Sequence, residues 1–351
     1  MLLEDAMTAA TMMTARATMA GTDHVAVSYH DTVSKLQALD HLAHSPFDRS
    51  DWYALLEQFG RHPTIAMAEH AGETAALALM RSASGLQSLN HWFAFAWRPL
   101  AAPGPAGDTL LRAIARDLRS QAPCVTLDYL PDEDGSATRL RAAFREAGWL
   151  TRLEPRDTNH VLEVGTRDFA AYWAQRPGPM RTTLKRKAKK VEVEILTHFD
   201  TQAWQAYGDI YNRSWKTEEK DADLLEAFAR REGALGHLRL GVARYEGVPV
   251  AAQFWTVEHG TAFIHKLAYD QDHAKLSAGT TLSAALFEHV IDTDHVQLVD
   301  FGTGEDGYKR DWMDTERPRY RLTCIDPWQF AAWRLVARKL ADRLASRLRR
   351  G

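Results

Sequence analysis

Cysteine is scarce in this sequence, and its two copies form no motif. Cys124 and Cys324 lie far apart, each within a strand-like apolar segment of the 351-residue chain. This usage indicates two buried, reduced thiols rather than a disulfide framework or a zinc site. The fifteen histidines include no pair at the spacing of a metalloprotease motif. We therefore expect no metal cofactor.

Long hydrophobic runs and a strong net charge are also absent. No uninterrupted apolar run approaches the roughly 18 residues of a membrane span. The formal net charge of -3 gives no global attraction to nucleic acid or to an anionic membrane. Residues 1–24 are rich in Ala, Thr and Met but lack the apolar core of a signal peptide. We expect this segment to be disordered and the protein to be cytoplasmic.

The sequence predicts the same order of strands and helices in each of its halves. In the second half, apolar alternation and turn residues predict three strands, a helix, a strand and a final strand. These segments are residues 237–245, 249–257, 261–268, 280–291, 296–301 and 320–325. The first half predicts the same order, with one further helix ending near Gly148 before its last strand. Its segments are residues 64–69, 74–80, 86–95, 108–120, 124–130 and 159–164.

The spacing of landmarks repeats as well. Gly107 precedes Asp128 by 21 positions, as Gly279 precedes Asp300, and the motifs LDYLPDEDG and VDFGTGEDG follow each other's pattern. Such internal similarity is typical of a duplicated architecture. We therefore predict an α+β protein of two tandem units with mixed, mostly antiparallel sheets flanked by helices. The units are residues 25–165 and 166–326, the second with a helical insert at 166–232.

The stretch HKLAYDQDHAKLSAGTTL…VDFGTGEDGYKRDW resembles a GNAT-like acyltransferase family in which two units are fused, related to Fem-type aminoacyl transferases. The resemblance covers residues 25–327 in architecture and is specific over 207–312. It implies N-acyl transfer from acyl-CoA or acetyl-CoA to an amine, such as a small molecule or an amino sugar. The loop that wraps the pyrophosphate in ordinary GNAT enzymes has more glycines than residues 275–280. The donor therefore stays open between acyl-CoA, acyl carrier protein and aminoacyl-tRNA.

A donor site is predicted where the third strand of the second unit passes into the following helix. The N-terminus of a helix binds phosphate through its unpaired backbone N–H groups. Gly279 would allow close approach, and Lys275 would add a positive charge. The predicted set is Lys275, Ser277, Gly279 and Thr280. The alternative is an ordinary Ser/Thr N-cap.

Three residues are predicted to carry the chemistry. Strand alternation places His265 and Lys266 on opposite faces, and the resemblance implies that Lys266 faces the cleft, where it would polarise a carbonyl or hold a carboxylate. Asp300 would accept a proton from the amine; alternatively, its duplicate Asp128 indicates a structural role. Tyr308 would protonate the leaving thiolate, as the resemblance implies.

A further group is predicted to bind the acceptor. Gln253 interrupts an apolar strand and needs a polar partner, which is either substrate or a neighbouring strand. An aromatic stripe with Trp215 at its end is either part of the site or helix packing. The full set is Trp215, Lys216, Gln253, Tyr269, Asp270 and Lys309. The first unit lacks this combination of residues and is expected to serve as a scaffold and as one wall of the cleft.

Two basic segments leave alternatives open. Residues 181–190 carry six basic residues, which would bind the phosphates of CoA or of tRNA, or form a solvated helix face. Otherwise no nucleic-acid partner is expected. Residues 327–351 predict a basic amphipathic helix, whose part 327–350 would dock on the protein or a partner, or contact a membrane peripherally. A non-catalytic binding protein with this fold is a further alternative.

Overall fold

The computed structural model describes residues 25–216, 219–304 and 306–330. The predicted disorder of residues 1–24 lies outside these ranges. Most of the predicted C-terminal helix, from residue 331 onward, does so too. Both predictions stay predictions.

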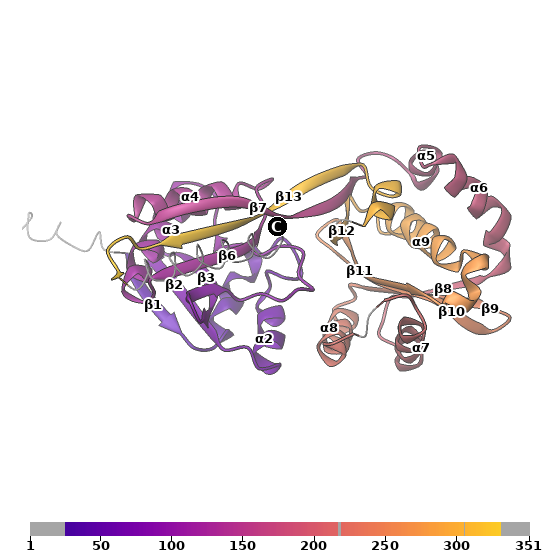
Figure 1. The fold of residues 1–351 in the computed structure, drawn as a ribbon, viewed down its shortest axis with the longest axis horizontal. Helices are drawn as coiled ribbons and strands as arrows, with labels where there is room; N and C mark the ends of the chain where they lie inside the picture. Colours follow the sequence, from indigo (N-terminus) through magenta and orange to yellow (C-terminus); the bar gives the residue numbers. More distant parts are fainter. Residues whose placement is uncertain (1–24, 217–218, 305, 331–351) are drawn as a thin grey trace, which may run out of the picture.

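The strands of the described residues form one continuous sheet in which antiparallel pairing dominates (Figure 1). Its order is β1-β2-β3-β4-β6-β13-β7-β12-β11-β10-β9-β8, and β5 pairs with β3. The only parallel pairs in the described sheet are β4 with β6 and β11 with β12. The strands are β1 Ala26–His30, β2 Pro63–His70, β3 Glu73–Ser82, β4 Gly85–Ser88, β5 Leu100–Ala101, β6 Cys124–Leu130, β7 Leu150–Glu163, β8 Glu192–Leu196, β9 Leu238–Tyr245, β10 Val248–Glu258, β11 Thr261–Tyr269, β12 Leu298–Thr303 and β13 Thr315–Ile325.

Two long strands join the units at the centre of this sheet. β7 pairs through its last residues with β12 of the second unit. β13 is the last strand of the second unit, yet it pairs with β6 of the first unit as well as with β7. Figure 1 shows β7 and β13 running from one unit into the other. Each unit therefore contributes a strand to the sheet of the other, which holds the two in a fixed arrangement.

Helices cover both faces of the sheet. In the second unit α9 packs on one face of β9 and β10, and α7 packs on the other. The α-helices are α2 Ser50–Gln58, α3 Pro105–Asp117, α4 Ser136–Glu146, α5 Phe169–Ala174, α6 Gly178–Lys187, α7 Thr201–Asn212, α8 Ala222–Ala234 and α9 Ala278–Glu288. Short 3-10 or π turns are η1 Ser34–Leu42, η2 Leu118–Ser120, η3 Ala188–Lys190, η4 Gln271–Leu276, η5 His289–Thr293 and η6 Gly307–Asp311.

Two hydrophobic cores lie against this sheet. One runs through the first unit and continues under α7 and α8, where Phe254 and Phe228 are buried. The other lies between α9 and the opposite face, where Trp255 packs against Phe287. Because neighbouring residues of a strand point to opposite faces, Phe254 and Trp255 belong to different cores. The second unit is therefore covered on both sides, and its site must open at an end or between strands.

The predicted α+β class is confirmed, and so are the two buried, free cysteines. Three predictions of local structure were wrong. The strand expected at residues 86–95 ends at Ser88, after which the chain turns towards the second unit. The helical insert contains β8, whose alternating EVEIL sequence was overlooked. The aromatic stripe stops with α7 at Asn212, so Trp215 lies beyond the helix.

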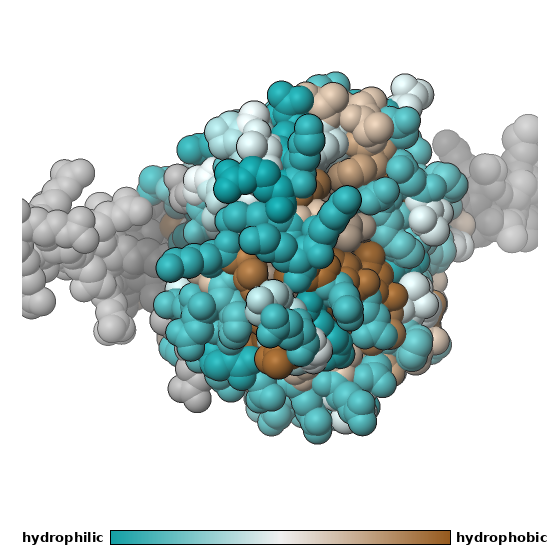
Figure 2. Space-filling view, turned by 90° about the vertical axis from the view of Figure 1, so that its right-hand side faces the viewer, coloured by the Kyte–Doolittle hydropathy of each residue, from teal (hydrophilic) through white to brown (hydrophobic). Residues whose placement is uncertain are grey.

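The end of the second unit that carries α6, β8 and β9 is mostly hydrophilic at its surface. Figure 2 shows hydrophilic side chains over most of this face and a hydrophobic area in its middle. In the part of the chain that the structure describes, every helix is too short or too polar to cross a membrane.

Candidate active site

A β-bulge on β11 sets the geometry of the site. Phe254 of β10 stands opposite Lys266, and the next residue, Trp255, stands opposite Ile264. His265 is therefore the extra residue of the bulge, and a bulge interrupts strand alternation. His265 and Lys266 both line one cavity, so the prediction that they face opposite sides was wrong.

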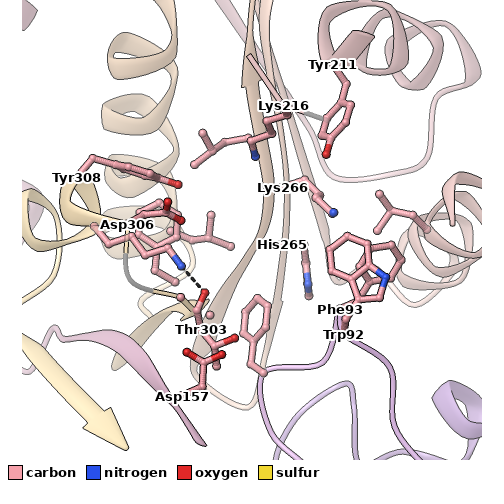
Figure 3. A pocket seen from close by; sticks show the side chains of 18 of the residues that line it. Trp92, Phe93, Asp157, Tyr211, Lys216, His265, Lys266, Thr303, Asp306 and Tyr308 are labelled. Atoms are coloured by element: carbon pink, nitrogen blue, oxygen red, sulfur yellow. Dashed lines mark hydrogen bonds between the residues drawn. The ribbon is translucent and has the colours of Figure 1, made fainter. Parts of the chain in front are cut away.

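This central cavity has a volume of about 340 Å³ and lies where the two units meet. The first unit supplies Trp92, Phe93 and Phe95 from the segment after β4, which forms the predicted wall. The second unit supplies charged and polar groups from β11, β12 and the segments after α7 and β12. In Figure 3, Lys216, Lys266 and Tyr308 project into the same space from different sides. The sequence did not predict that Trp92, Phe93 and Phe95 line this cavity, because aromatic residues outside a strand or helix have no periodic pattern that shows what they contact.

Lys266 is held in this cavity by an ion pair. Its Nζ donates to Glu219 at 2.6 Å and lies 4.2 Å and 4.4 Å from the ring centroids of Trp92 and Phe93. Burial disfavours the ammonium and lowers the pKa of Lys266, whereas Glu219 opposes this shift. Lys266 is therefore held at the boundary of the two units by Glu219 and the two aromatic rings.

The bulged His265 is a neutral group in an aromatic environment. Its Nε2 lies 2.7 Å from Thr256 Oγ1, and its ring packs against Phe228 and Phe254. Burial and the neighbouring Lys266 lower the pKa of His265 to about 3. At neutral pH the imidazole is uncharged and is already engaged by Thr256.

Tyr308 and Lys309 come from η6, next to the end of β12. Tyr308 is 40% exposed at the mouth of the cavity. Burial of its hydroxyl and the charge of Asp306 raise the pKa of Tyr308, so the phenol stays protonated. Lys309 is buried, and its Nζ donates to the carbonyl of Thr303 at 2.5 Å. Lys309 thus closes the loop that presents Tyr308.

A second cavity of about 680 Å³ lies on the other side of β11, beside α9. Ser277, Gly279 and Thr280 line this α9 cavity, as the donor-site prediction expected. Lys275 is exposed on η4 and is absent from the lining. Ser277 makes no capping hydrogen bond and instead accepts one from Lys187 of α6. The capping alternative therefore does not hold, and the first N–H groups of α9 point to the cavity end of the helix.

The predicted acceptor residues divide between the cavities. Trp215 and Tyr269 are in contact, with ring centroids 4.7 Å apart and planes tilted by 39°, and both line the α9 cavity. Gln253 also borders it, but its amide donates to Ser283 and its carbonyl accepts from Trp255. Gln253 thus fixes α9 to the sheet. Lys216 lines the central cavity.

Asp300 and Asp270 are not brought together with the other predicted residues. Asp300 accepts hydrogen bonds from Asn159 and from the N–H of Gly302, and it faces a separate cavity of about 140 Å³ that Arg319 also lines. Burial raises the pKa of Asp300 against the effect of Arg319. Asp270 caps η4 and pairs with Arg213 at 2.9 Å. Both carboxylates have structural partners.

The basic segment 181–190 lies beside the α9 cavity. α6 packs against α9, and Met180 and Thr183 line the cavity. Lys187 reaches Ser277 at 3.0 Å, whereas most of the other basic side chains are exposed. The charge run was visible in the sequence, but only the fold shows that it adjoins the N-terminus of α9.

One group of side chains in the described residues has the composition of a metal site. The ligand atoms of Glu232, His237 and Glu258 lie within 4.8 Å of one another. Arg49 of the first unit also pairs with Glu232 and lies 3.5 Å from Glu258. A guanidinium therefore already supplies positive charge to these carboxylates, which are a contact between the units.

Comparisons with known proteins agree with this architecture. Residues 179–310 match the family model described as an acetyltransferase (GNAT) domain. No curated protein matches the chain significantly in sequence. FemX superposes with a TM-score of 0.60 at 8% identity, over 84% of this chain and 96% of that chain. L-PGS from Bacillus licheniformis gives 0.55 at 12% identity, over 84% and 96%.

A third structure, from Agrobacterium fabrum, is described as the C-terminal domain of a candidate lysylphosphatidylglycerol synthetase. It gives a TM-score of 0.51 at 14% identity, over 81% of this chain and 90% of that chain. At such identities these structures show the fold alone. Together with the family match, they confirm the resemblance of the sequence to fused GNAT-like units related to Fem-type transferases.

Proposed function

We propose that the protein is an N-acyltransferase that moves an acyl group from an acyl-CoA-type thioester to an amine. The observation that supports this most is that β11 and β12 separate. They pair only from Thr261 to Phe263, although β11 continues to Tyr269. The central cavity and the α9 cavity lie on the two sides of this gap, and both are lined by Leu267, Phe301, Asp306 and Tyr308.

This gap brings a donor and an acceptor to one point. In this proposal the donor lies in the α9 cavity with a phosphate at the N-terminus of α9. The acceptor lies in the central cavity, between the two units. Beyond Phe263 the edge of β11 that faces the gap has no partner strand, so backbone N–H groups there are available to a thioester carbonyl. The transfer would occur between the strands.

Tyr308 would complete the transfer. The amine nitrogen attacks the carbonyl carbon, the C–N bond forms and the C–S bond breaks. The thiolate then takes the proton of the Tyr308 hydroxyl, which its raised pKa keeps protonated. No covalent enzyme intermediate is needed, because an amine attacks a thioester directly. Asp300 has no part in this proposal, since it faces another cavity.

Thermal unfolding tests the donor. Acetyl-CoA, CoA and a long-chain acyl-CoA at about 100 times their dissociation constant should each add about 2.7 kcal/mol of stability. Thr280→Asp should remove this shift, because its carboxylate repels the phosphate. The variant should still fold, since an acidic residue in the first turn stabilises a helix. Gly208→Asp in α7, where a side chain has open space, is the matched control and should keep the shift. No shift with any thioester in the wild type would contradict the acyl-CoA donor.

A charged tRNA is the second candidate donor, and α6 favours it. The exposed basic residues of α6 and η3 adjoin the α9 cavity and would follow a phosphate backbone. In this case binding of charged tRNA should weaken steeply with salt. A variant with Arg181, Lys185 and Arg186 changed to Gln should lose that salt dependence. If neither a thioester nor tRNA binds, the non-catalytic alternative remains.

A further inference from the structure

Three lysines line the central cavity, and two of them already have partners. Lys266 is paired with Glu219, and Lys309 donates to the carbonyl of Thr303. The side chain of Lys216 makes no hydrogen bond or ion pair with any described residue; its Nζ lies 5.6 Å and 5.7 Å from the ring centroids of Trp215 and Tyr211. The charges of Asp306 and Glu219 favour its ammonium form, but without a direct contact. Among the described residues, the amine of Lys216 is therefore left without a hydrogen-bond partner.

The position of Lys216 puts that amine at the centre of the site. It follows α7 and lines the central cavity together with Lys266, Asp306 and Tyr308. It also lines a neighbouring cavity of about 400 Å³ with Trp92 and Tyr308. Figure 3 shows Lys216 between the side that carries Tyr308 and the side that carries Lys266. An acceptor in the central cavity would therefore contact it.

The electrostatic setting favours the neutral amine. Burial, and after it the positive charge of Lys266, lower the pKa of Lys216 to about 8. A lysine with a pKa close to the working pH can accept a proton and release it again. At pH 7 roughly a tenth of such a group is neutral, against less than a thousandth for an ordinary lysine.

Asp157 and Asp306 also line the central cavity, but three other groups that might accept a proton are engaged elsewhere. Asp300 faces a separate cavity. Glu219 is bound to Lys266, and its loss would leave a buried ammonium unpaired. His265 is next to Thr256, and its low pKa makes it a poor base.

We propose, on the basis of the function proposed above, that Lys216 is the general base that takes the proton from the acceptor nitrogen. When the amine attacks the thioester carbonyl, its nitrogen gains positive charge and must lose one proton. Neutral Lys216 accepts this proton, the C–S bond breaks, and the thiolate is protonated by Tyr308. Lys216 then releases its proton to solvent and the Tyr308 phenolate takes one up. The sum is one amine and one thioester converted to one amide and one thiol.

Two substitutions distinguish this role from a binding role. Lys216→Arg keeps the positive charge but cannot deprotonate near neutral pH. Lys216→Met keeps the length and apolar contacts without an amine. If Lys216 is the base, both variants lose about 100-fold in kcat/KM. If it only holds an anionic group, Lys216→Arg retains most of the activity, and this outcome overturns the proposal.

The assay uses acetyl-CoA as donor and hydroxylamine as a general amine acceptor, with hydroxamate measured after subtraction of the uncatalysed reaction. In the wild type kcat/KM should rise with pH and level off above about 8, because the neutral form of Lys216 increases through its pKa. This rising limb should be absent from both variants. A limb that persists in Lys216→Met would overturn the proposal. Unchanged stabilisation of both variants by acetyl-CoA shows that they fold.

A measurement without turnover separates this inference from the proposed function. Trinitrobenzenesulfonate modifies neutral amines, and the modification of Lys216 is followed by peptide mass spectrometry between pH 6 and pH 11. We expect half-modification near pH 8 for Lys216, well below that of N-acetyl-lysine methylamide as internal standard. Lys266→Met should move the midpoint upward, because it removes a like charge and frees Glu219. A midpoint above about 10 overturns the inference even if acyl transfer is found, whereas a wild type without acyl transfer or acetyl-CoA binding counts against the proposed function.

Discussion

The two units share their order of strands and helices except for one helix, and they differ in what lies beside α3 and α9. In the first unit, α4 follows the β6 strand and packs against α3. At the corresponding place of the second unit, β12 is followed by the single turn η6, and the space beside α9 is the α9 cavity. The motifs before α4 and η6, LDYLPDEDG and VDFGTGEDG, share four of their nine residues. The presence or absence of one helix therefore decides whether the space beside the preceding helix is filled or remains a cavity.

The first unit instead contributes to the site of the second. Its chain leaves the sheet after Ser88 and carries Trp92, Phe93 and Phe95 into the central cavity. Arg319 on β13 fixes this segment, because its Nε donates to the carbonyl of Phe95. In the proposed reaction the second unit holds the reacting groups, and the first supplies these aromatic side chains to the cavity wall.

The largest expected effect comes from the repeated glycines. A Cβ on Gly107 would lie 2.0 Å from the carbonyl oxygen of Ala102, which is backbone and cannot move aside. Gly107→Ala should therefore destabilise the protein by about 3 kcal/mol. A Cβ on Gly279 would lie 3.3 Å from the ring of Tyr269, which borders a cavity and can shift.

Gly279→Ala should consequently change stability by less than about 1 kcal/mol, since alanine also favours the helix. Urea unfolding of both variants measures the difference. Equal losses would show that the two positions are packed alike, against the comparison made here.

Tyr308→Phe should give the next largest effect, on activity rather than stability. Loss of the proton donor should lower kcat for hydroxamate formation from acetyl-CoA by about 100-fold. The matched variant in the first unit is Tyr129→Phe, on β6, which should leave the rate unchanged. Equal rates for Tyr308→Phe and the wild type would remove Tyr308 from the proposed mechanism.

The ion pairs of the two units should also differ. Lys266 and Glu219 are both less than 10% exposed, whereas Arg321 and Asp128 are 35% and 24% exposed. Lys266→Met leaves a buried carboxylate alone and should cost about 2 kcal/mol, much of which Glu219→Gln in the same chain should restore. Arg321→Met should cost less than about 1 kcal/mol. Urea unfolding of the three variants tests this, and equal costs for both single changes would contradict it.

The sequence predicted most of the fold because alternation and turn residues are local. The three strands β9 to β11, α9, and the repeat of Gly107 and Gly279 all followed from it. The bulge at His265 could not be predicted, because it depends on the register between two strands. Nor could the crossing of β13 into the first unit, which is a long-range pairing without a local signal.

The site was predicted unevenly for the same reason. Lys266, Tyr308 and Gly279 lie at strand and helix ends that one unit defines by itself. Asp300 was predicted to lie beside them because it ends a predicted strand. It faces another cavity instead, where its neighbours Asn159 and Arg319 come from β7 and β13. Residues contributed by the other unit are the part that a local pattern cannot indicate.

The smallest expected effect concerns the contact between the units and its dependence on pH. Glu258 is buried near Glu232 and Asp51, with Arg49 as the opposing cation and His237 beside it, and burial raises its pKa from 4.5 to about 7. The folded protein therefore binds more protons than the unfolded chain between about pH 4.5 and 7, so this group lowers stability as the pH rises through that window. Glu258→Gln, which mimics the protonated form, should match the wild type near pH 5 and exceed its stability at pH 8 by on the order of 1 kcal/mol. Urea unfolding at the two pH values measures this, and a variant that is less stable at pH 8 would show that the ionised carboxylate, held by Arg49, joins the units.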